Sequence, residues 1–141
     1  MGTRLAPTIS PDTQFFWDGL RDHTILIQQC SDCGTRRFPP RPMCFSCQSL
    51  KWETVTAAGT GTVHSFVMPQ YPPLPFFEYP YIVALIDLDE GVRLVSNLTD
   101  VAPDDVHIGM PVTAYFTTFD TLDKEELVLH QFRPTAAAVG D

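Results

Sequence analysis

The chain of 141 residues has the usual size of one domain or of two small dependent modules, and this length excludes a large multi-domain enzyme. Its composition is 44% hydrophobic and 11% aromatic, which provides enough apolar material for a core and excludes a disordered chain. Nine Lys and Arg against 17 Asp and Glu give a formal net charge of −8, the wrong sign for gripping nucleic-acid phosphates.

The negative charge is confined to one half of the chain. Residues 1–58 hold six basic and five acidic residues (+1), whereas residues 59–141 hold three and twelve (−9). No apolar run reaches the ~18 residues of a membrane span, and the first ten residues lack the apolar region of a secretory signal. We therefore expect a cytoplasmic protein with neither a membrane nor a nucleic acid as partner. Thirteen prolines disfavour a helical bundle and favour strands joined by stiff loops.

The first predicted element is a short helix. Residues 1–9 read as a loose leader, and Ser10, Pro11 and Asp12 then supply an N-cap, a first-turn proline and a first-turn acid. Apolar residues at helical spacing predict about three turns ending near Asp22, with an apolar face that needs a partner surface. The β-branched run at residues 24–29 predicts a strand that leads directly into the first cysteine.

All four cysteines fall in one 18-residue window, as Cys30-Ser-Asp-Cys33 and Cys44-Phe-Ser-Cys47. A tetrahedral Zn²⁺ site needs four ligands at ~2.3 Å, and a two-residue gap lets one tight turn deliver two thiolates to the same ion. The pattern predicts one closed, structural zinc site, with Gly34 left-handed after the first pair. The alternatives are two disulfides or a redox Cys-x-x-Cys, which the missing secretory signal and the missing βαβ context disfavour.

Three arginines lie between the two cysteine pairs, at Arg36, Arg37 and Arg41. One interpretation is that their charge compensates the four thiolates. The other is that they contact the phosphates of a nucleotide-like cofactor such as coenzyme A, because guanidinium groups bind phosphate well. Both interpretations stay open at this point.

From Gly59 onward the sequence consists of strand-forming runs separated by turn signals. The second and third strand-like runs are joined by a predicted tight turn at residues 87–91, and Gly59 and Gly61 mark a strand start or bulge rather than a dinucleotide loop. Five strands in about 75 residues predict a small barrel. The five runs cover residues 59–69, 81–91, 92–100, 110–120 and 126–134.

A long linker, PQYPPLPFFEYP at residues 69–80, joins the first two of these runs. Its aromatic residues cannot all fit beneath a small barrel that already has enough Val, Ile and Leu to fill itself. One interpretation makes the loop a partner interface with anchors at Tyr71, Phe76, Phe77 and Tyr79, since proline reduces the entropy lost on docking. The other makes it a cap on the barrel end or the seam with the zinc module.

The sequence lacks a Gly-x-Ser-x-Gly, a P-loop and a His-Glu-x-x-His motif, and the zinc assignment leaves no thiol nucleophile. The four histidines, His23, His64, His107 and His130, are scattered singly, and no acid/base dyad stands out. Acids at the predicted hairpin, Asp87, Asp89 and Glu90, are expected as solvated turn formers. We therefore expect no catalysis by the chain alone.

Together the motifs resemble a known family. The CSDCG knuckle, the PPRP lead to the second knuckle, GTGTVHSF, PYIVALIDLDEGVRLV and IGMPV resemble the family catalogued as domain of unknown function thirty-five. The resemblance covers about residues 12–134. It implies a mainly β fold with a short N-terminal helix, a rubredoxin-like zinc ribbon and a five-stranded OB-fold barrel. The predicted parts are residues 1–23 (leader and helix), 24–58 (ribbon), 59–134 (OB-fold) and 135–141 (flexible tail).

The resemblance also implies a function beside coenzyme A enzymes. FFWDGL with CSDCG and GTVHSF is similar to the carboxyl-terminal domain of a steroid side-chain enoyl-CoA hydratase subunit. Such domains pair with lipid-transfer-protein-type aldolases of the thiolase superfamily, which cleave β-hydroxyacyl-CoA side chains by retro-aldol chemistry. We expect a non-catalytic accessory subunit in a heteromer built on the partner's dimer, with the coenzyme A thioester as substrate of the complex. The alternatives are an acyl-CoA carrier module and an accessory domain of a hot-dog-fold hydratase.

Overall fold

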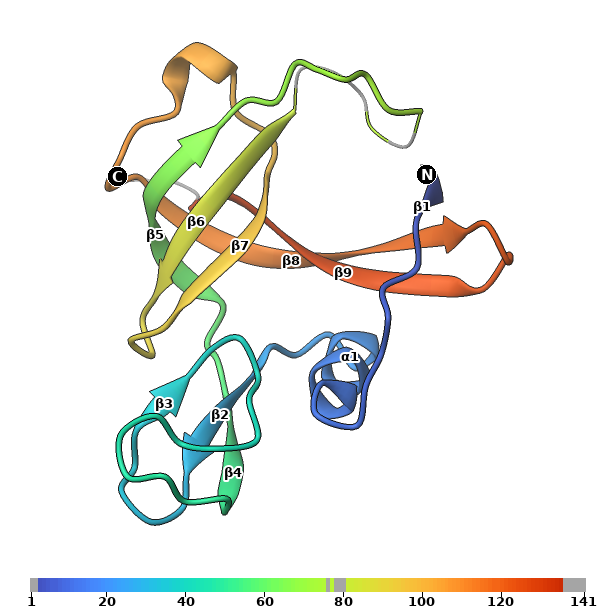
Figure 1. Cartoon of the computed structure of the whole chain (residues 1–141). Helices are drawn as coiled ribbons and strands as arrows, with labels where there is room; N and C mark the ends of the chain where they lie inside the picture. Colours follow the sequence, from blue (N-terminus) through green and yellow to red (C-terminus); the bar gives the residue numbers. More distant parts are fainter. Residues whose placement is uncertain (1–2, 76, 78–80, 136–141) are drawn as a thin grey trace.

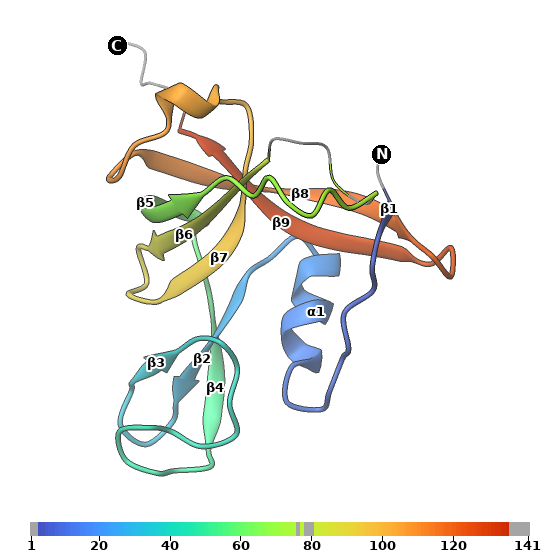
Figure 2. The same cartoon turned by 45° about the horizontal axis from the view of Figure 1, so that its top comes forward.

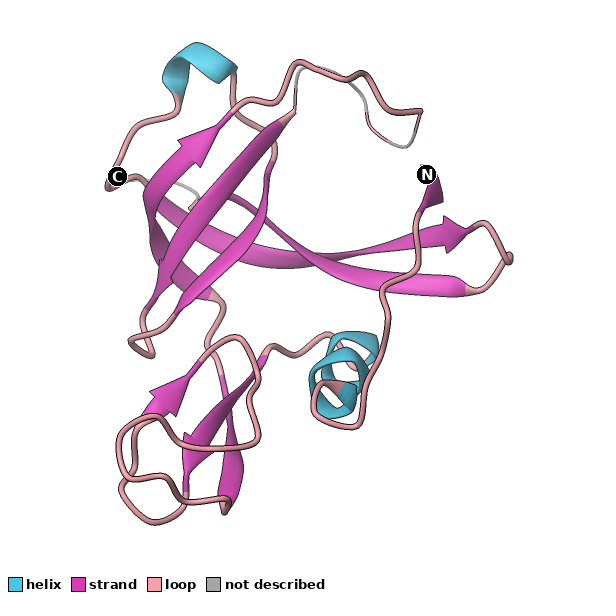
Figure 3. Ribbon diagram, viewed as in Figure 1, coloured by secondary structure: helices cyan, strands magenta, loops and turns pink. Residues whose placement is uncertain are grey.

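The computed structural model describes residues 3–75, 77 and 81–135. It is built mostly of strands with one short α-helix, as predicted (Figure 3). The elements are β1 (Thr3–Arg4), α1 (Gln14–Arg21), β2 (Leu26–Cys30), β3 (Arg36–Arg37), β4 (Trp52–Thr56), β5 (Thr60–Val67), β6 (Ile82–Leu88), β7 (Arg93–Leu98), the 3-10 turn η1 (Pro103–Asp105), β8 (Pro111–Thr121) and β9 (Glu126–Pro134).

The second half of the chain forms a closed five-stranded barrel. The strands follow the order β8-β5-β6-β7-β9, and an antiparallel β8–β9 pairing joins the two ends of this series (Figure 1). The β7–β9 contact is parallel, whereas the other contacts between barrel strands are antiparallel. All five predicted runs form strands, and the turn predicted at residues 87–91 joins β6 to β7. The prediction of a barrel is confirmed.

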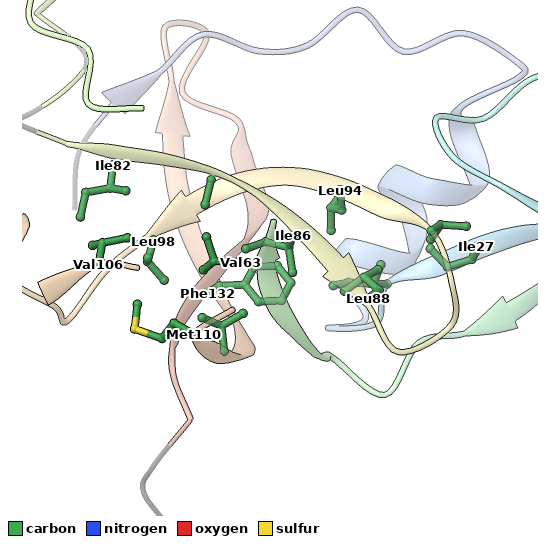
Figure 4. Packing of buried hydrophobic residues seen from close by; sticks show 14 of the residues in the cluster. Ile27, Val63, Ile82, Ile86, Leu88, Leu94, Leu98, Val106, Met110 and Phe132 are labelled. Carbon is green, nitrogen blue, oxygen red and sulfur yellow. The ribbon is translucent and has the colours of Figure 1, made fainter. Parts of the chain in front are cut away.

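Alternating side chains of the barrel strands fill its interior. Along β6 the buried residues Ile82, Ala84, Ile86 and Leu88 alternate with partly exposed ones, the period-2 pattern of a strand with one face in a core. Phe132 of β9 is fully buried among them (Figure 4). The cluster continues beyond the barrel through residues of the first half: Phe16, Leu20, Ile25 and Ile27.

The first half forms a small three-stranded sheet, in the order β3-β2-β4, with α1 beside it. The helix lies beside this sheet and below β9, and it contacts both β2 and β9 (Figure 2). Phe15 packs on Trp52 of β4 with ring centroids 4.8 Å apart, and Phe16 packs on both Phe38 and His130 at 5.3 and 5.9 Å. The partner surface predicted for the helix is therefore the seam between the two sheets.

Two predictions for the first 22 residues were wrong in detail. The helix begins after Thr13, not after Ser10. The reason is a closed turn: the Thr13 N–H donates to the Ser10 carbonyl at 3.0 Å, and the Ser10 N–H donates to Thr13 Oγ1 at 3.1 Å, so Ser10 is used before the helix starts. The leader is not loose throughout, because Thr3 and Arg4 pair in parallel with Asp120 and Thr121 of β8.

Among the helices of the described residues, none is long and apolar enough to cross a membrane.

Candidate functional site

The four cysteines meet at the tip of the three-stranded sheet. Their Sγ atoms all lie within 4.8 Å of one another. The Cys30–Cys47 and Cys33–Cys44 Sγ pairs are 3.5 and 3.6 Å apart, too far for disulfide bonds. Cys30 and Cys44 are buried, whereas Cys33 and Cys47 are exposed. Two buried and two exposed cysteines thus place their Sγ atoms around one position.

The two Cys-x-x-Cys turns share the same backbone hydrogen bond but differ in which N–H points to the first sulfur. In the first, the Cys33 N–H points to the Cys30 sulfur and the Gly34 N–H donates to the Cys30 carbonyl. In the second, the Ser46 N–H points to the Cys44 sulfur and the Gln48 N–H donates to the Cys44 carbonyl. The residue after each pair is left-handed, with φ of 78° at Gly34, as predicted, and 64° at Gln48. A repeated turn therefore presents two thiols from each side.

This donor set fits a tetrahedral metal ion. Four ligands at ~2.3 Å from a central Zn²⁺ stand about 3.8 Å apart, close to the two sulfur–sulfur distances given above. A site with four thiolates leaves no open coordination position for a substrate, so its role is structural.

The predicted arginines lie on one wall of a groove between this sheet and the β6–β7 hairpin. Arg36, Arg37 and Arg41 line the groove on the ribbon side, and Arg93 of β7 lines it on the barrel side. The first three lie close together in the sequence, whereas Arg93 lies more than 50 residues away in the chain and no local pattern links it to them. Only the closure of the barrel brings the four together.

A histidine–aspartate pair that was not predicted from the sequence lies at the barrel edge of this groove. His64 Nδ1 is 3.0 Å from Asp87 Oδ2, and the Arg93 Nε donates to Asp87 Oδ1 at 2.7 Å. The hydrogen bond from Arg93, followed by the one from His64, lowers the pKa of the Asp87 carboxyl. Asp87 therefore stays a carboxylate held by a permanent cation, which suits a structural ion pair better than proton transfer.

Glu90 was expected as a solvated turn former, and this prediction was wrong. Its Oε2 accepts the Ala58 N–H at 2.9 Å, and its backbone carbonyl accepts a hydrogen bond from Arg36 Nη1 at 3.1 Å. The turn between β6 and β7 is therefore tied to the ribbon and to the linker that enters the barrel. These bonds fix the width of the groove at its rim.

The linker at residues 69–80 divides into exposed and packed parts. Tyr71 is 87% exposed, which suits the predicted role as a partner anchor. Phe77 instead stacks on Tyr81 with ring centroids 4.7 Å apart, and the Arg4 guanidinium lies 4.6 Å from its ring centre, as expected of an internal cap. The other two predicted anchors, Phe76 and Tyr79, lie outside the described residues.

Comparison with protein families divides the chain within β4, just before the passage from the ribbon to the barrel. Residues 17–53 match the family described as the ChsH2 rubredoxin-like zinc ribbon domain, and residues 54–117 match the ChsH2 C-terminal OB-fold domain. The chain is 34% identical over 122 residues to a DUF35 domain-containing scaffold protein of Pyrococcus furiosus, covering 84% of this chain and 90% of that protein.

Two hydratase subunits are also similar to the chain. It is 46% identical over 131 residues to a probable enoyl-CoA hydratase alpha subunit of Thermomonospora curvata, covering 93% of this chain and 40% of that protein. It is 41% identical over 115 residues to the 3-oxo-4,17-pregnadiene-20-carboxyl-CoA hydratase alpha subunit of Mycobacterium tuberculosis, covering 82% and 37% respectively. The chain thus spans less than half the length of these two relatives.

Among solved structures, a chain of one described as an Ltp2-ChsH2(DUF35) aldolase matches with a TM-score of 0.86 and 44% identity. The match covers 93% of this chain and 100% of that chain.

Proposed function

The chain belongs to the DUF35 family, which joins a zinc ribbon to an OB-fold, and on this premise we propose that it is a non-catalytic accessory subunit of a thiolase-superfamily aldolase of the lipid-transfer-protein type. The observation that carries the proposal is the match of nearly the whole chain to a complete chain of a solved aldolase. The described residues add to this support, because the cysteine site is closed and the His64–Asp87 pair is held by Arg93.

The proposed substrate of the complex is a steroid side-chain β-hydroxyacyl-CoA, which the partner cleaves by retro-aldol chemistry to a shorter acyl-CoA. The name of the Mycobacterium tuberculosis relative, a pregnadiene-carboxyl-CoA hydratase subunit, supports this substrate class. Structural Zn²⁺ at Cys30, Cys33, Cys44 and Cys47 belongs to the same proposal. A reducing compartment such as the cytoplasm suits four free thiols that hold a metal.

The proposed docking surface is the exposed part of the 69–80 linker together with the adjoining outer face of the barrel. On this face Val67 and Val95 are 61% and 58% exposed, and Val67 pairs with Val83. A groove of about 370 Å³ beside them is lined partly by Val83, Val95 and Phe77. Exposed apolar residues around a concave centre are typical of a protein interface, and we propose that the aldolase covers them.

A test of this function needs both components. The chain alone should not turn over acyl-CoA substrates, whereas a mixture with a thiolase-fold aldolase of the same host should cleave a β-hydroxyacyl-CoA and elute as one complex. Tyr71→Ala together with Val95→Ser should weaken the complex about tenfold or more. Leu122→Ser, which changes a residue exposed to a similar extent on the β8–β9 turn, is the matched control. Cleavage by the isolated chain, or full aldolase affinity in the double variant, would contradict the proposal.

The second candidate function is that of an accessory domain of an enoyl-CoA hydratase, because both longer relatives are named as alpha subunits of acyl-CoA hydratases. Purification of the chain from its host separates the candidates. A stoichiometric thiolase-fold protein supports the aldolase, a hot-dog-fold protein supports the hydratase, and a monomer that retains a coenzyme A ligand supports an independent carrier.

A further inference from the structure

The groove between the zinc ribbon and the β6–β7 hairpin has an unusual concentration of positive charge. It has a volume of about 630 Å³, and four of the nine basic residues of the chain, Arg36, Arg37, Arg41 and Arg93, line it. The chain as a whole has a net charge of −8. Asp87 is the acidic residue in the lining, and Arg93 and His64 already hold it. A cationic cleft on an acidic protein points to an anionic ligand.

The hydrogen bonds that the ribbon arginines form within the described residues do not involve a carboxylate. Arg36 donates from Nε to Gln29 Oε1 and from Nη1 to the Glu90 carbonyl. Arg37 donates from Nε and Nη2 to the Arg41 carbonyl, at 3.1 and 2.9 Å. All of these acceptors are neutral. Within residues 3–75, 77 and 81–135, neither these two arginines nor Arg41 forms a salt bridge.

Arg37 is the most informative of the four. It is only 3% exposed, and its Nη1 is buried without a hydrogen-bond partner. Burying a charged group without a counter-charge is costly, and such a cation is retained where an anion compensates it. Because its guanidinium is covered, Arg37 acts from beneath the groove floor: it contributes positive potential and holds the backbone of Arg41 in place.

Direct neutralisation of the cysteine sulfurs is the other explanation for these arginines. In the described residues the Cys33 and Ser46 N–H groups donate to the sulfurs, the thiols contact one another, and the Cys33 thiol donates to the Thr35 hydroxyl. None of these contacts involves a guanidinium group. The arginines thus lie near the ribbon tip but contact the groove rather than the sulfurs.

An aromatic ring completes the groove. Phe45, the residue after Cys44, lines it and is 69% exposed, which is unusual for a phenylalanine with no partner ring nearby in the described structure. An exposed ring beside a phosphate-binding cation offers a stacking surface for a planar base. Guanidinium groups bind phosphate through paired N–H donors.

We propose that this groove binds a nucleoside diphosphate, with Arg36, Arg41 and Arg93 donating to the phosphates and Phe45 stacking on the base. The proposal deepens the proposed function and rests on it for the biological ligand, since the nucleoside diphosphate portion of an acyl-CoA has this chemistry. Arg93 joins the predicted phosphate contacts, and Arg37 becomes a positioning residue rather than a contact.

The test is calorimetric titration of the isolated 141-residue chain with ADP, inorganic pyrophosphate and adenosine, at low and moderate salt, with metal analysis before and after. ADP should bind most tightly, pyrophosphate more weakly and adenosine hardly at all. Arg41→Gln should weaken ADP and pyrophosphate about tenfold each. Phe45→Ala should weaken ADP alone. Arg21→Gln, which removes one exposed arginine on α1, is the matched control and should change neither affinity.

Absence of ADP binding, or an equal loss in Arg21→Gln, would overturn the proposal. Equal affinities for ADP and pyrophosphate would overturn the role of Phe45 and the nucleoside assignment. Loss of aldolase binding in Arg41→Gln without any anion binding would identify the groove as a protein contact instead. The titration contains no aldolase, so it tests the anion site alone. The cleavage assay of the mixture uses the unmodified chain, so it tests the accessory-subunit function alone. Failure of the anion site is therefore distinguishable from failure of the accessory-subunit function.

Discussion

The zinc ribbon and the barrel are stabilised in different ways, although they share one chain. The barrel strands contribute most of the buried apolar cluster, whereas the ribbon strands contribute Ile27 alone, with Ile25 just before them. Strand β4 of the ribbon has no buried residue along its whole length. A sheet with so little apolar burial cannot offset its loss of conformational entropy, so it needs a metal ion. The barrel needs none, so the two parts should respond differently to metal loss, core mutation and acid.

The largest expected effect is loss of the metal. Cys44→Ser, or treatment with a strong zinc chelator, should unfold the ribbon, since structural zinc contributes about 10 kcal/mol or more to such folds. Amide exchange by NMR should lose protection in β2 and β4 but keep it in β6 and β9. Ser46→Ala, at an exposed neighbour of Cys44, should retain one metal ion per chain.

Two results would contradict this expectation. One is a purified protein without zinc or iron whose thiols titrate as two disulfides. The other is a barrel that loses protection together with the ribbon. Iron in place of zinc after overexpression would leave the assignment intact, because four-thiolate sites accept either metal.

The next effect should fall on the barrel. Phe132 is completely buried at the centre of the cluster, and Phe132→Ala should lower the free energy of unfolding by about 3–5 kcal/mol through lost burial and a cavity. Urea denaturation followed by circular dichroism measures this loss. The zinc content per chain should stay at wild type. Val95→Ala on the outer face should change stability by less than about 0.5 kcal/mol.

Acid should also destabilise the barrel through His130. Burial lowers the pKa of His130 to about 4, while the unfolded chain takes up this proton near pH 6.5. The unfolded state therefore binds more protons in this window, and stability should fall by of order 1–3 kcal/mol as the pH drops from 6.5 to 4. His130→Gln should remove most of this slope in urea titrations, whereas His107→Gln, at an exposed site, should keep it.

The smallest effects should come from the two cysteine turns. Gly34 has open space around its Cα, so Gly34→Ala should cost about 1 kcal/mol through the left-handed backbone alone. Gln48 has the same backbone with a side chain, and Gln48→Gly should be neutral or stabilising by up to about 1 kcal/mol. Zinc-affinity measurements on both variants check this pair. A Gly34→Ala variant that is more stable than the wild type, together with a Gln48→Gly variant that is less stable, would contradict the prediction.

Features that are determined by short stretches of sequence were predictable. The spacing of the four cysteines indicated the cluster, and β-branched alternation with the acidic turn indicated the β6–β7 hairpin. Both depend on residues close together in the chain. The left-handed conformation at Gly34 followed from the residue type, whereas Gln48 carries no such signal.

Features set by strand register were not predictable. The register between β5 and β6 shifts between Val63 and Ser65, which leaves His64 beside Asp87, and no local pattern shows this shift. The meeting of Arg93 with the ribbon arginines depends on how the barrel packs on the ribbon. The start of the helix was predicted wrongly for a related reason. Ser10 and Thr13 are both good capping residues, and the turn that joins them determines that the helix begins after Thr13.

The two-residue strand β1 has a consequence for self-association. Barrel closure leaves most strand edges paired, but β8 runs to Thr121, beyond the residues where it contacts β5, so its far end presents open backbone groups. Thr3 and Arg4 cover that stretch at Asp120 and Thr121. Arg4 also places a cation there, between the rings of Phe77 and Phe119. A paired and charged strand end is a poor template for strands of another copy, so this end of β8 is protected from edge-to-edge pairing.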